Sequence, residues 1–172
     1  MNTAVVLGET RAQPFDSKRK DIKNRYLESL TLIERLHRRL LDVIKDDFER
    51  SGDKEVNPVQ ALLLFNISDA ELTAGELKTR GHYQGSNVSY NLKKLVEQGF
   101  VKHERSHSDK RSVRVSLTDK GDAIRARVDA LYNRQLQAIE EVVGLSTDEF
   151  DRLNKALGRL ERFWTDQILY RL

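Results

Sequence analysis

Much of the chain repeats apolar residues at steps of three and four, the spacing that gathers side chains on one side of an α-helix. The first such segment extends from about residue 21 to residue 50, with a stripe of Tyr26, Leu30, Ile33, Leu36, His37, Leu40, Ile44 and Phe48. A second set broadens the apolar surface: Leu27, Leu32, Leu41 and Val43. A helix that is apolar on more than one side needs more than one packing partner, so we expect this one to pack on its own lobe and on another subunit.

A short buried helix is predicted next. Asn57 is a good N-cap, and Pro58 suits the first helical position, where its fixed φ and missing N–H cost little. Residues 59–67, VQALLLFNI, are apolar nearly all round. Such a segment is stable in water only when it is covered on every side.

Two more helices are predicted at the C-terminal end. Thr118 caps the first, which extends from about Asp119 to Val143 and ends at Gly144; its stripe is Ile124, Val128, Leu131, Tyr132, Gln135, Ile139 and Val142. Ser146 and Glu149 form a capping box for the second. Its stripe is Phe150, Leu153, Leu157, Leu160, Trp164 and Ile168, and it also carries Phe163, Leu169 and Tyr170. This last helix has more large apolar surface than a small lobe can cover.

Between these helices, residues 72–117 have a different pattern. Thr73 and Glu76 form a capping box for a helix that ends near Gly81, and a second helix follows with Val88, Leu92 and Leu95 toward the core. The opposite side of that second helix carries hydrogen-bonding and cationic groups: Ser86, Tyr90, Lys93, Lys94 and Glu97, with Asn87, Ser89 and Asn91 at its flanks. Such a surface suits the major groove of DNA.

Two strands are expected after the second helix. Gly99 can end the helix in the left-handed region, and residues 100–105 and 112–117 have the composition of paired strands, the latter alternating apolar and polar residues. The connection, residues 106–111 (SHSDKR), is polar and basic. Helix, turn, helix and a hairpin with a basic loop make a winged helix-turn-helix, so the predicted fold is mainly α (α+β).

The residues of this segment resemble the multiple antibiotic resistance regulator (MarR) family of bacterial transcription factors. The resemblance is carried by Leu72-Thr73, Glu76-Leu77, Val88-Ser89, Leu92, Leu95, Gly99-Phe100-Val101, Asp109-Lys110-Arg111 and Leu117-Thr118-Asp119-Lys120-Gly121. GSNVSYNLKKL further resembles the recognition helix of the alphaproteobacterial branch that regulates L,D-transpeptidase genes. His82 and Tyr90 depart from the family pattern, where many relatives have a turn glycine and an arginine, so the operator sequence of better-known members cannot be transferred.

The resemblance implies a homodimer that binds a pseudo-palindromic operator in double-stranded DNA. Its base- and phosphate-contacting residues would be Ser86, Asn87, Ser89, Tyr90, Asn91, Lys93, Lys94, Lys110 and Arg111, with Asp109 orienting the wing. Arg111 would reach the adjacent minor groove, whose narrowed A·T-rich segments attract arginine. The first and last helices would interlock the two chains, as they do in the family.

The resemblance also implies control by a small aromatic or apolar ligand. Leu62 and Phe65 lie one turn apart and are candidates to face a crevice toward Ile44, at the junction where many relatives bind such molecules. Ordinary core packing is the alternative for each of these three residues. No cofactor or bound metal is expected.

Composition and charge agree with a DNA-binding interpretation. The 172 residues have a net charge of +3, but residues 73–117 hold nine cations against four anions, so this segment is at +5 and the rest at −2. A basic segment in a slightly acidic chain is typical of a nucleic-acid surface. The sequence has no cysteine, which excludes disulfides and thiol sensing, and no apolar run of about 20 residues for a membrane span, so a cytoplasmic protein is expected.

We therefore expect four regions: a flexible arm (1–20), a first dimerisation helix with its loop (21–56), the DNA-binding lobe (57–117) and C-terminal dimerisation helices (118–172). In the arm, the basic run at residues 18–20 is a candidate phosphate contact, with simple solvation as the alternative. No catalytic motif is present, so an enzyme is not expected. The main alternative function is a winged-helix module for protein association without a specific operator.

One alternative concerns metal binding. His103, His107 and Asp109 combine imidazoles and a carboxylate around the wing, the ligand types that zinc accepts. A flexible wing is a poor preorganised site, however, and the resemblance gives Asp109 the role of orienting the wing. We therefore favour no metal site here.

Overall fold

The structure, a computed structural model, describes residues 14–52, 54–67, 72–73, 85–105 and 113–170. The chain forms two compact units, Met1–Lys54 and Glu55–Leu172. Within the described residues, no helix is long and apolar enough to cross a membrane.

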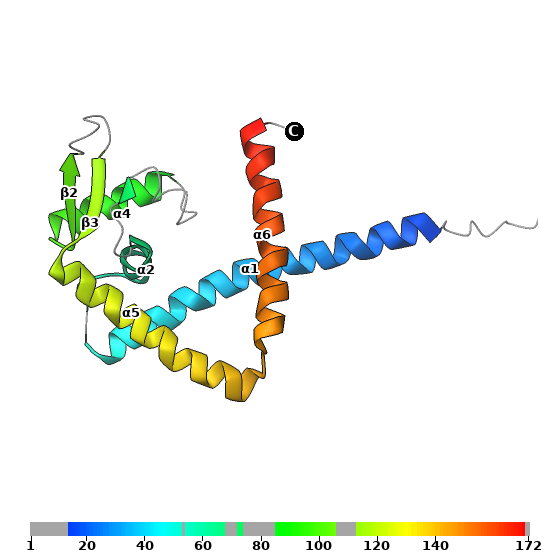
Figure 1. The fold of residues 1–172 in the computed structure, drawn as a ribbon, viewed down its shortest axis with the longest axis horizontal. Helices are drawn as coiled ribbons and strands as arrows, with labels where there is room; N and C mark the ends of the chain where they lie inside the picture. Colours follow the sequence, from blue (N-terminus) through cyan, green and yellow to red (C-terminus); the bar gives the residue numbers. More distant parts are fainter. Residues whose placement is uncertain (1–13, 53, 68–71, 74–84, 106–112, 171–172) are drawn as a thin grey trace, which may run out of the picture. The chain divides into compact units, whose positions relative to one another are not determined.

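The described part of the first unit contains one helix, α1 (Pro14–Arg50), coloured blue to cyan in Figure 1. It ends where the sequence predicts, with Gly52 at a φ of 75° and its N–H donating to the carbonyl oxygen of Glu49 at 3.1 Å. Its start differs from the expectation, because the helix begins at Pro14 rather than near residue 21. Proline is well suited to a first helical position, so residues 14–20 belong to the helix and not to an arm; residues 1–13 lie outside the described part.

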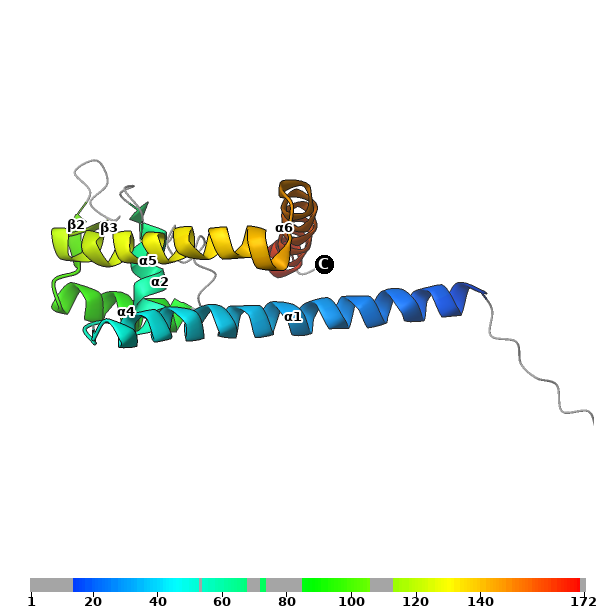
Figure 2. The same ribbon diagram turned by 90° about the horizontal axis from the view of Figure 1, so that it is seen from below.

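In the second unit, α2 (Pro58–Ile67) is the buried helix that its composition predicts. The N–H of Gln60 donates to Asn57 Oδ1 at 2.9 Å, and Gln60 Oε1 accepts from the N–H of Asn57 at 3.0 Å. This reciprocal pair is a capping box that satisfies two of the helix's otherwise unpaired donors. The helix contacts both α4 (Gly85–Glu97) and α5 (Asp119–Ala138), and Figures 1 and 2 show it between them.

Within the described residues, the sheet has three strands in the order β1-β3-β2, where the sequence predicts two. β2 (Val101–Arg105) and β3 (Val113–Leu117) pair antiparallel as expected, with His103 opposite Val115. The additional strand, β1 (Leu72–Thr73), pairs with the other edge of β3. Thr73 therefore lies at the end of a strand; the helix expected after it, up to Gly81, is outside the described residues.

The long helix predicted from Asp119 to Val143 is interrupted. α5 ends at Ala138, and a π turn, η1 (Ile139–Val143), follows before Gly144 at a φ of 68°. A π turn winds an extra residue into its ring, so positions after it leave the phase of the preceding helix. Val142, expected on the buried stripe, is accordingly 82% exposed.

The last helix, α6 (Thr147–Tyr170), starts at the predicted capping box. Glu149 accepts hydrogen bonds from the N–H and the hydroxyl of Ser146 at 2.9 and 2.7 Å, and Ser146 Oγ accepts from the N–H of Glu149 at 3.3 Å. These bonds stabilise the carboxylate and lower the pKa of Glu149. No residue of α6, which is described throughout, is buried within this single chain.

Candidate DNA-binding surface

The helix α4 has one buried side and one exposed side, as its sequence predicts. Leu92 and Leu95 are buried beneath it. On the other side Tyr90 is 62% exposed, and Ser89, Lys93 and Lys94 are exposed as well. The exposed side therefore combines a phenol hydroxyl, a serine hydroxyl and two ammonium groups, which can hydrogen-bond base edges and contact phosphates.

Asn91 does not belong to this exposed surface. The helical period places it at the flank, but its side chain is only 5% exposed. Whether a flanking position is covered depends on the neighbouring elements, which a helical wheel cannot represent. We therefore correct its expected placement and leave Asn91 out of the interface. Ser86 and Asn87 lie in the first turn of α4, and their side chains are outside the described part.

Glu97 is paired with both lysines of this surface. Its carboxylate oxygens lie 3.9 Å from Lys93 Nζ and 3.7 Å from Lys94 Nζ. All three side chains are well exposed, and exposed pairs of this kind contribute only about 0.3–0.5 kcal/mol. The pairs are therefore weak enough for a phosphate to replace the carboxylate as the partner of either lysine.

Two further cations lie on the strands that lead into the wing. Lys102 on β2 and Arg114 on β3 are exposed, and the register places Lys102 opposite Ser116 and Arg114 opposite Glu104. Neither residue is among the DNA contacts that the sequence predicts. The alternation of apolar and polar residues in β3 does indicate that Arg114 is exposed, since it places Arg114 on the face opposite to that of Val115.

The wing itself, with Asp109, Lys110 and Arg111, lies outside the described residues, as does His107. Their expected roles stay predictions. Among the residues that the structure describes, no group of three histidine or acidic side chains could hold a metal ion.

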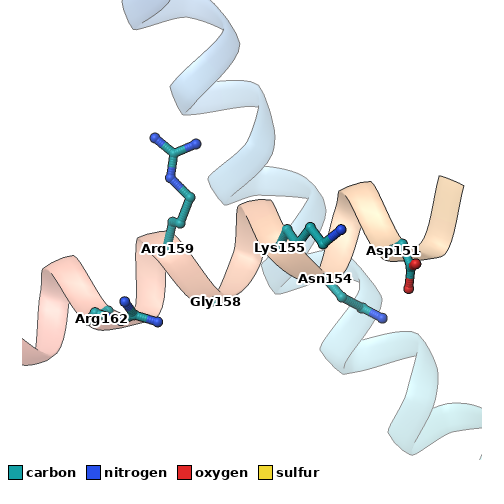
Figure 3. A pocket seen from close by; sticks show the side chains of 6 residues that line it. All are labelled: Asp151, Asn154, Lys155, Gly158, Arg159 and Arg162. Atoms are coloured by element: carbon teal, nitrogen blue, oxygen red, sulfur yellow. The ribbon is translucent and has the colours of Figure 1, made fainter. Parts of the chain in front are cut away.

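The helix α6 presents two distinct faces. Asp151, Asn154, Lys155, Gly158, Arg159 and Arg162 line a shallow polar depression along one of them (Figure 3). The other face carries large apolar side chains that are exposed in the single chain: Leu153, Leu157, Trp164 and Ile168. An amphipathic helix with an uncovered apolar face is the arrangement expected of an interface helix.

The candidate ligand-contacting residues have ordinary packing partners where they are described. Leu62 is buried in α2, and the ring of Phe65 meets that of Tyr132 on α5 edge-to-face, with 5.0 Å between centroids. Burial raises the pKa of Tyr132, so its phenol stays neutral over a wider pH range. Ile44 belongs to the other unit, so a crevice that it shares with Leu62 and Phe65 stays a prediction.

Comparison with known proteins identifies the class of fold. A profile described as a winged helix DNA-binding domain matches residues 56–121. The fold is similar to that of the transcriptional regulator SlyA, with a TM-score of 0.68 and 19% identity over 83% of this chain and 98% of that one. It is also similar to a cysteine-to-serine mutant of MarR from E. coli in complex with operator DNA, with a TM-score of 0.62 and 25% identity over 80% of this chain and 96% of that one. The fold and the surface together define a winged-helix DNA-binding protein.

A curated relative extends the similarity along most of the chain. The exopolysaccharide II synthesis transcriptional activator ExpG of Rhizobium meliloti (strain 1021) is 35% identical over 150 residues, which are 84% of this chain and 74% of ExpG. The chain belongs to the MarR family of winged-helix transcriptional regulators. It is a DNA-binding regulator of transcription rather than an enzyme.

Proposed function

We propose that the protein acts as a homodimer that binds a pseudo-palindromic operator, with α4 of each subunit in the major groove and the wing against the neighbouring minor groove. The observation that carries this proposal is the exposed surface of Tyr90, Lys93 and Lys94 on a helix whose opposite side is buried. Ser89 lies beside them, and Ser86, Asn87, Lys110 and Arg111 complete the proposed contacts. Two such helices about one turn of DNA apart would read two half-sites.

The dimer is supported by the uncovered apolar surface of the long helices. Leu157 and Ile168 on α6, and Leu27 and Leu36 on α1, are all large apolar side chains exposed to water in the single chain. Exposed large apolar side chains on long helices favour an interaction site on each helix, and a closed two-fold dimer would cover them in both copies at once.

The wing is proposed to contribute position and affinity. Arg111 would insert into a narrow minor groove, where the negative potential is strongest, and Asp109 would orient the loop. Lys102 and Arg114, on the two strands that lead into the wing, would add phosphate contacts. These contacts would strengthen binding to any DNA and would fix the register of α4 on its half-site.

A small aromatic or apolar molecule is the proposed effector. With no cysteine in the sequence, thiol oxidation cannot serve as the trigger. The ring of an aromatic ligand could replace that of Phe65 against Tyr132, because a single edge-to-face pair contributes little energy. The effector would act only by preferring one arrangement of the dimer over the other.

The target genes are proposed from the relative. ExpG is an activator of exopolysaccharide II synthesis, and its similarity to this chain includes the DNA-binding lobe. Genes for a surface polysaccharide, under positive control, are therefore the first to examine. Regulation of L,D-transpeptidase genes, predicted from the recognition helix, is the second.

The experiment that tests operator binding begins with genomic DNA fragments recovered with the purified protein. Their affinity is measured by fluorescence anisotropy against random DNA over a range of salt concentrations. We expect enrichment of fragments with an inverted repeat, tighter binding to them than to random DNA, and a steep fall of affinity with salt.

Substitutions on α4 test whether its exposed side is the surface that binds DNA. Lys93→Ala and Lys94→Ala should each weaken binding and lower the salt dependence, whereas Lys155→Ala, on the polar face of α6, serves as a matched control and should change neither. Equal binding to all fragments, with no effect of the α4 variants, would instead favour a protein-association module.

A further inference from the structure

The turn that follows α4 and the N-terminal end of α5 meet in a small hydrogen-bonded junction. The N–H of Phe100 donates to the carbonyl oxygen of Leu95 at 2.9 Å, and the N–H of Gly99 donates to that of Val96 at 3.1 Å. With Gly99 at a φ of 76°, these two bonds form a Schellman motif, which ends the helix and turns the chain into β2. Phe100 is fully buried there.

Thr118 connects this turn to α5. Its hydroxyl donates to the carbonyl oxygen of Gly99 at 2.7 Å and accepts from the N–H of Gly121 at 3.2 Å. Its N–H donates to the carbonyl oxygen of Phe100 at 3.1 Å. One side chain therefore caps α5 and also binds the turn that follows α4.

Gly121 permits the close approach of the two segments. A Cβ on Gly121 would overlap the carbonyl oxygen of Phe100 and would lie 3.3 Å from Leu117 Cδ2. The φ of Gly121 is not in the left-handed region, so glycine is needed at this position for space and not for backbone conformation. Any larger residue would push the turn after α4 away from α5.

The lysine beside this glycine adds a contact from the same turn of α5. Lys120 Nζ lies 4.2 Å from the centroid of the Phe100 ring, and it also lies 3.2 Å from Glu55 Oε2. The start of α5 thus contacts Phe100, in the turn after α4, in three ways: through the N–H of Thr118, through Gly121 and through the cation–π contact of Lys120. These contacts join the turn after α4 to the first turn of α5.

We propose that Thr118 and Gly121 are positioning residues for operator recognition, which fix the angle between α4 and α5 and thereby the distance between the two recognition helices of the dimer. The proposal rests on the dimeric operator binding proposed above. Neither residue touches DNA; both act through the direction in which α4 points. The property that they control is the preferred spacing between half-sites, because a tilt of each α4 changes the separation of the pair.

The test measures affinity for the operator and for operators with one base pair inserted or deleted between the half-sites. Thr118→Val keeps the shape of the side chain and removes both hydrogen bonds of the hydroxyl; Thr118→Ser restores them. Gly121→Ala introduces the overlapping methyl group. Val128→Ala is the control for stability, since Val128 is fully buried in α5 away from the junction.

We expect Thr118→Val and Gly121→Ala to reduce the preference for the native spacing about tenfold or more, because each of the two junctions in the dimer is loosened or displaced. Thr118→Ser should behave as wild type. Val128→Ala should lower the melting temperature and keep the wild-type preference.

A wild-type preference in Thr118→Val would overturn the proposal, and so would the same loss of preference in Val128→Ala, which would show that stability alone controls it. If Gly121→Ala does not fold, the comparison of Thr118→Val with Thr118→Ser still tests the proposal. A wild-type protein that binds all spacings equally would contradict the dimeric operator model itself, and the positioning role with it.

Discussion

The dimer can be tested at one side chain near the end of α6. Ile168 is 78% exposed in the single chain and lies on the apolar face of the helix. Ile168→Ala removes three of its four side-chain carbons, each worth about 0.8 kcal/mol when buried. If the partner covers the exposed part completely, the loss is about 2 kcal/mol per protomer and about 4 kcal/mol per dimer, or about a thousandfold in the dimer dissociation constant. If the partner covers half of the exposed part, the dimer dissociation constant rises about thirtyfold.

The measurement is sedimentation or fluorescence dilution of the purified protein over a wide concentration range. The fold of a single chain should be unaffected, because the side chain is exposed and alanine is a better helix former than isoleucine. Asn154→Ala is the matched control, since Asn154 lies on the polar face of the same helix (Figure 3) and should leave the dissociation constant within about twofold of wild type. A change of less than about threefold for Ile168→Ala, with unchanged helicity, would refute the assignment of this face to the dimer interface.

Four further results are expected. Tyr90→Ala should lower affinity for the operator by about 1 to 3 kcal/mol and affinity for random DNA much less; an equal loss on both in titrations would contradict base reading by Tyr90. Arg111→Ala should weaken binding and make its salt dependence shallower, because fewer counterions are released, and an unchanged slope would argue against wing contact. Phe65→Ala and Leu62→Ala should reduce the release of DNA by phenolic or aromatic acids relative to Val128→Ala; equal release from all three would place the ligand elsewhere. The pKa of Glu149 is depressed in the fold, so its carboxylate should stabilise α6 above its ordinary pKa and lose that effect as pH falls through the lowered value; Glu149→Gln should abolish this part of the pH dependence of thermal unfolding, and an identical pH profile would contradict the capping role.

Local chemistry explains why most helix boundaries could be predicted. The caps at Asn57, Thr118 and Ser146 each use a side chain and a backbone N–H three residues apart, so the signal lies within one short window of sequence. Gly99 and Gly144 likewise adopt the positive φ that ends a helix. The same applies to the alternation of β3, where Val115 is fully buried and Arg114 exposed.

Features that depend on distant parts of the chain could not be predicted in this way. β1 exists because Leu72 and Thr73 meet the free edge of β3, more than forty residues along the chain. The burial of Asn91 depends on which elements cover the flank of α4. The π turn at Ile139–Val143 has the composition of an ordinary helix and changes only the helical phase. The spacing of apolar residues therefore predicts an uninterrupted helix across it.

The packing of α2, α5 and α4 also indicates how a ligand bound at Phe65 and Tyr132 could change the position of the DNA-binding helix α4. Phe65 on α2 contacts Tyr132 on α5, and the other end of α5 is joined to α4 by Thr118 and Gly121. An aromatic pair contributes about 0.5–1.5 kcal/mol beyond the area that it buries, and a tenfold change in DNA affinity requires about 1.4 kcal/mol of difference between the two states. A ligand ring that replaced Phe65 against Tyr132 in one arrangement of α5, and not in the other, would therefore supply an effect of the required size. If the junction keeps α4 fixed to α5 as proposed, a change in the direction of α5 would move the recognition helix with it.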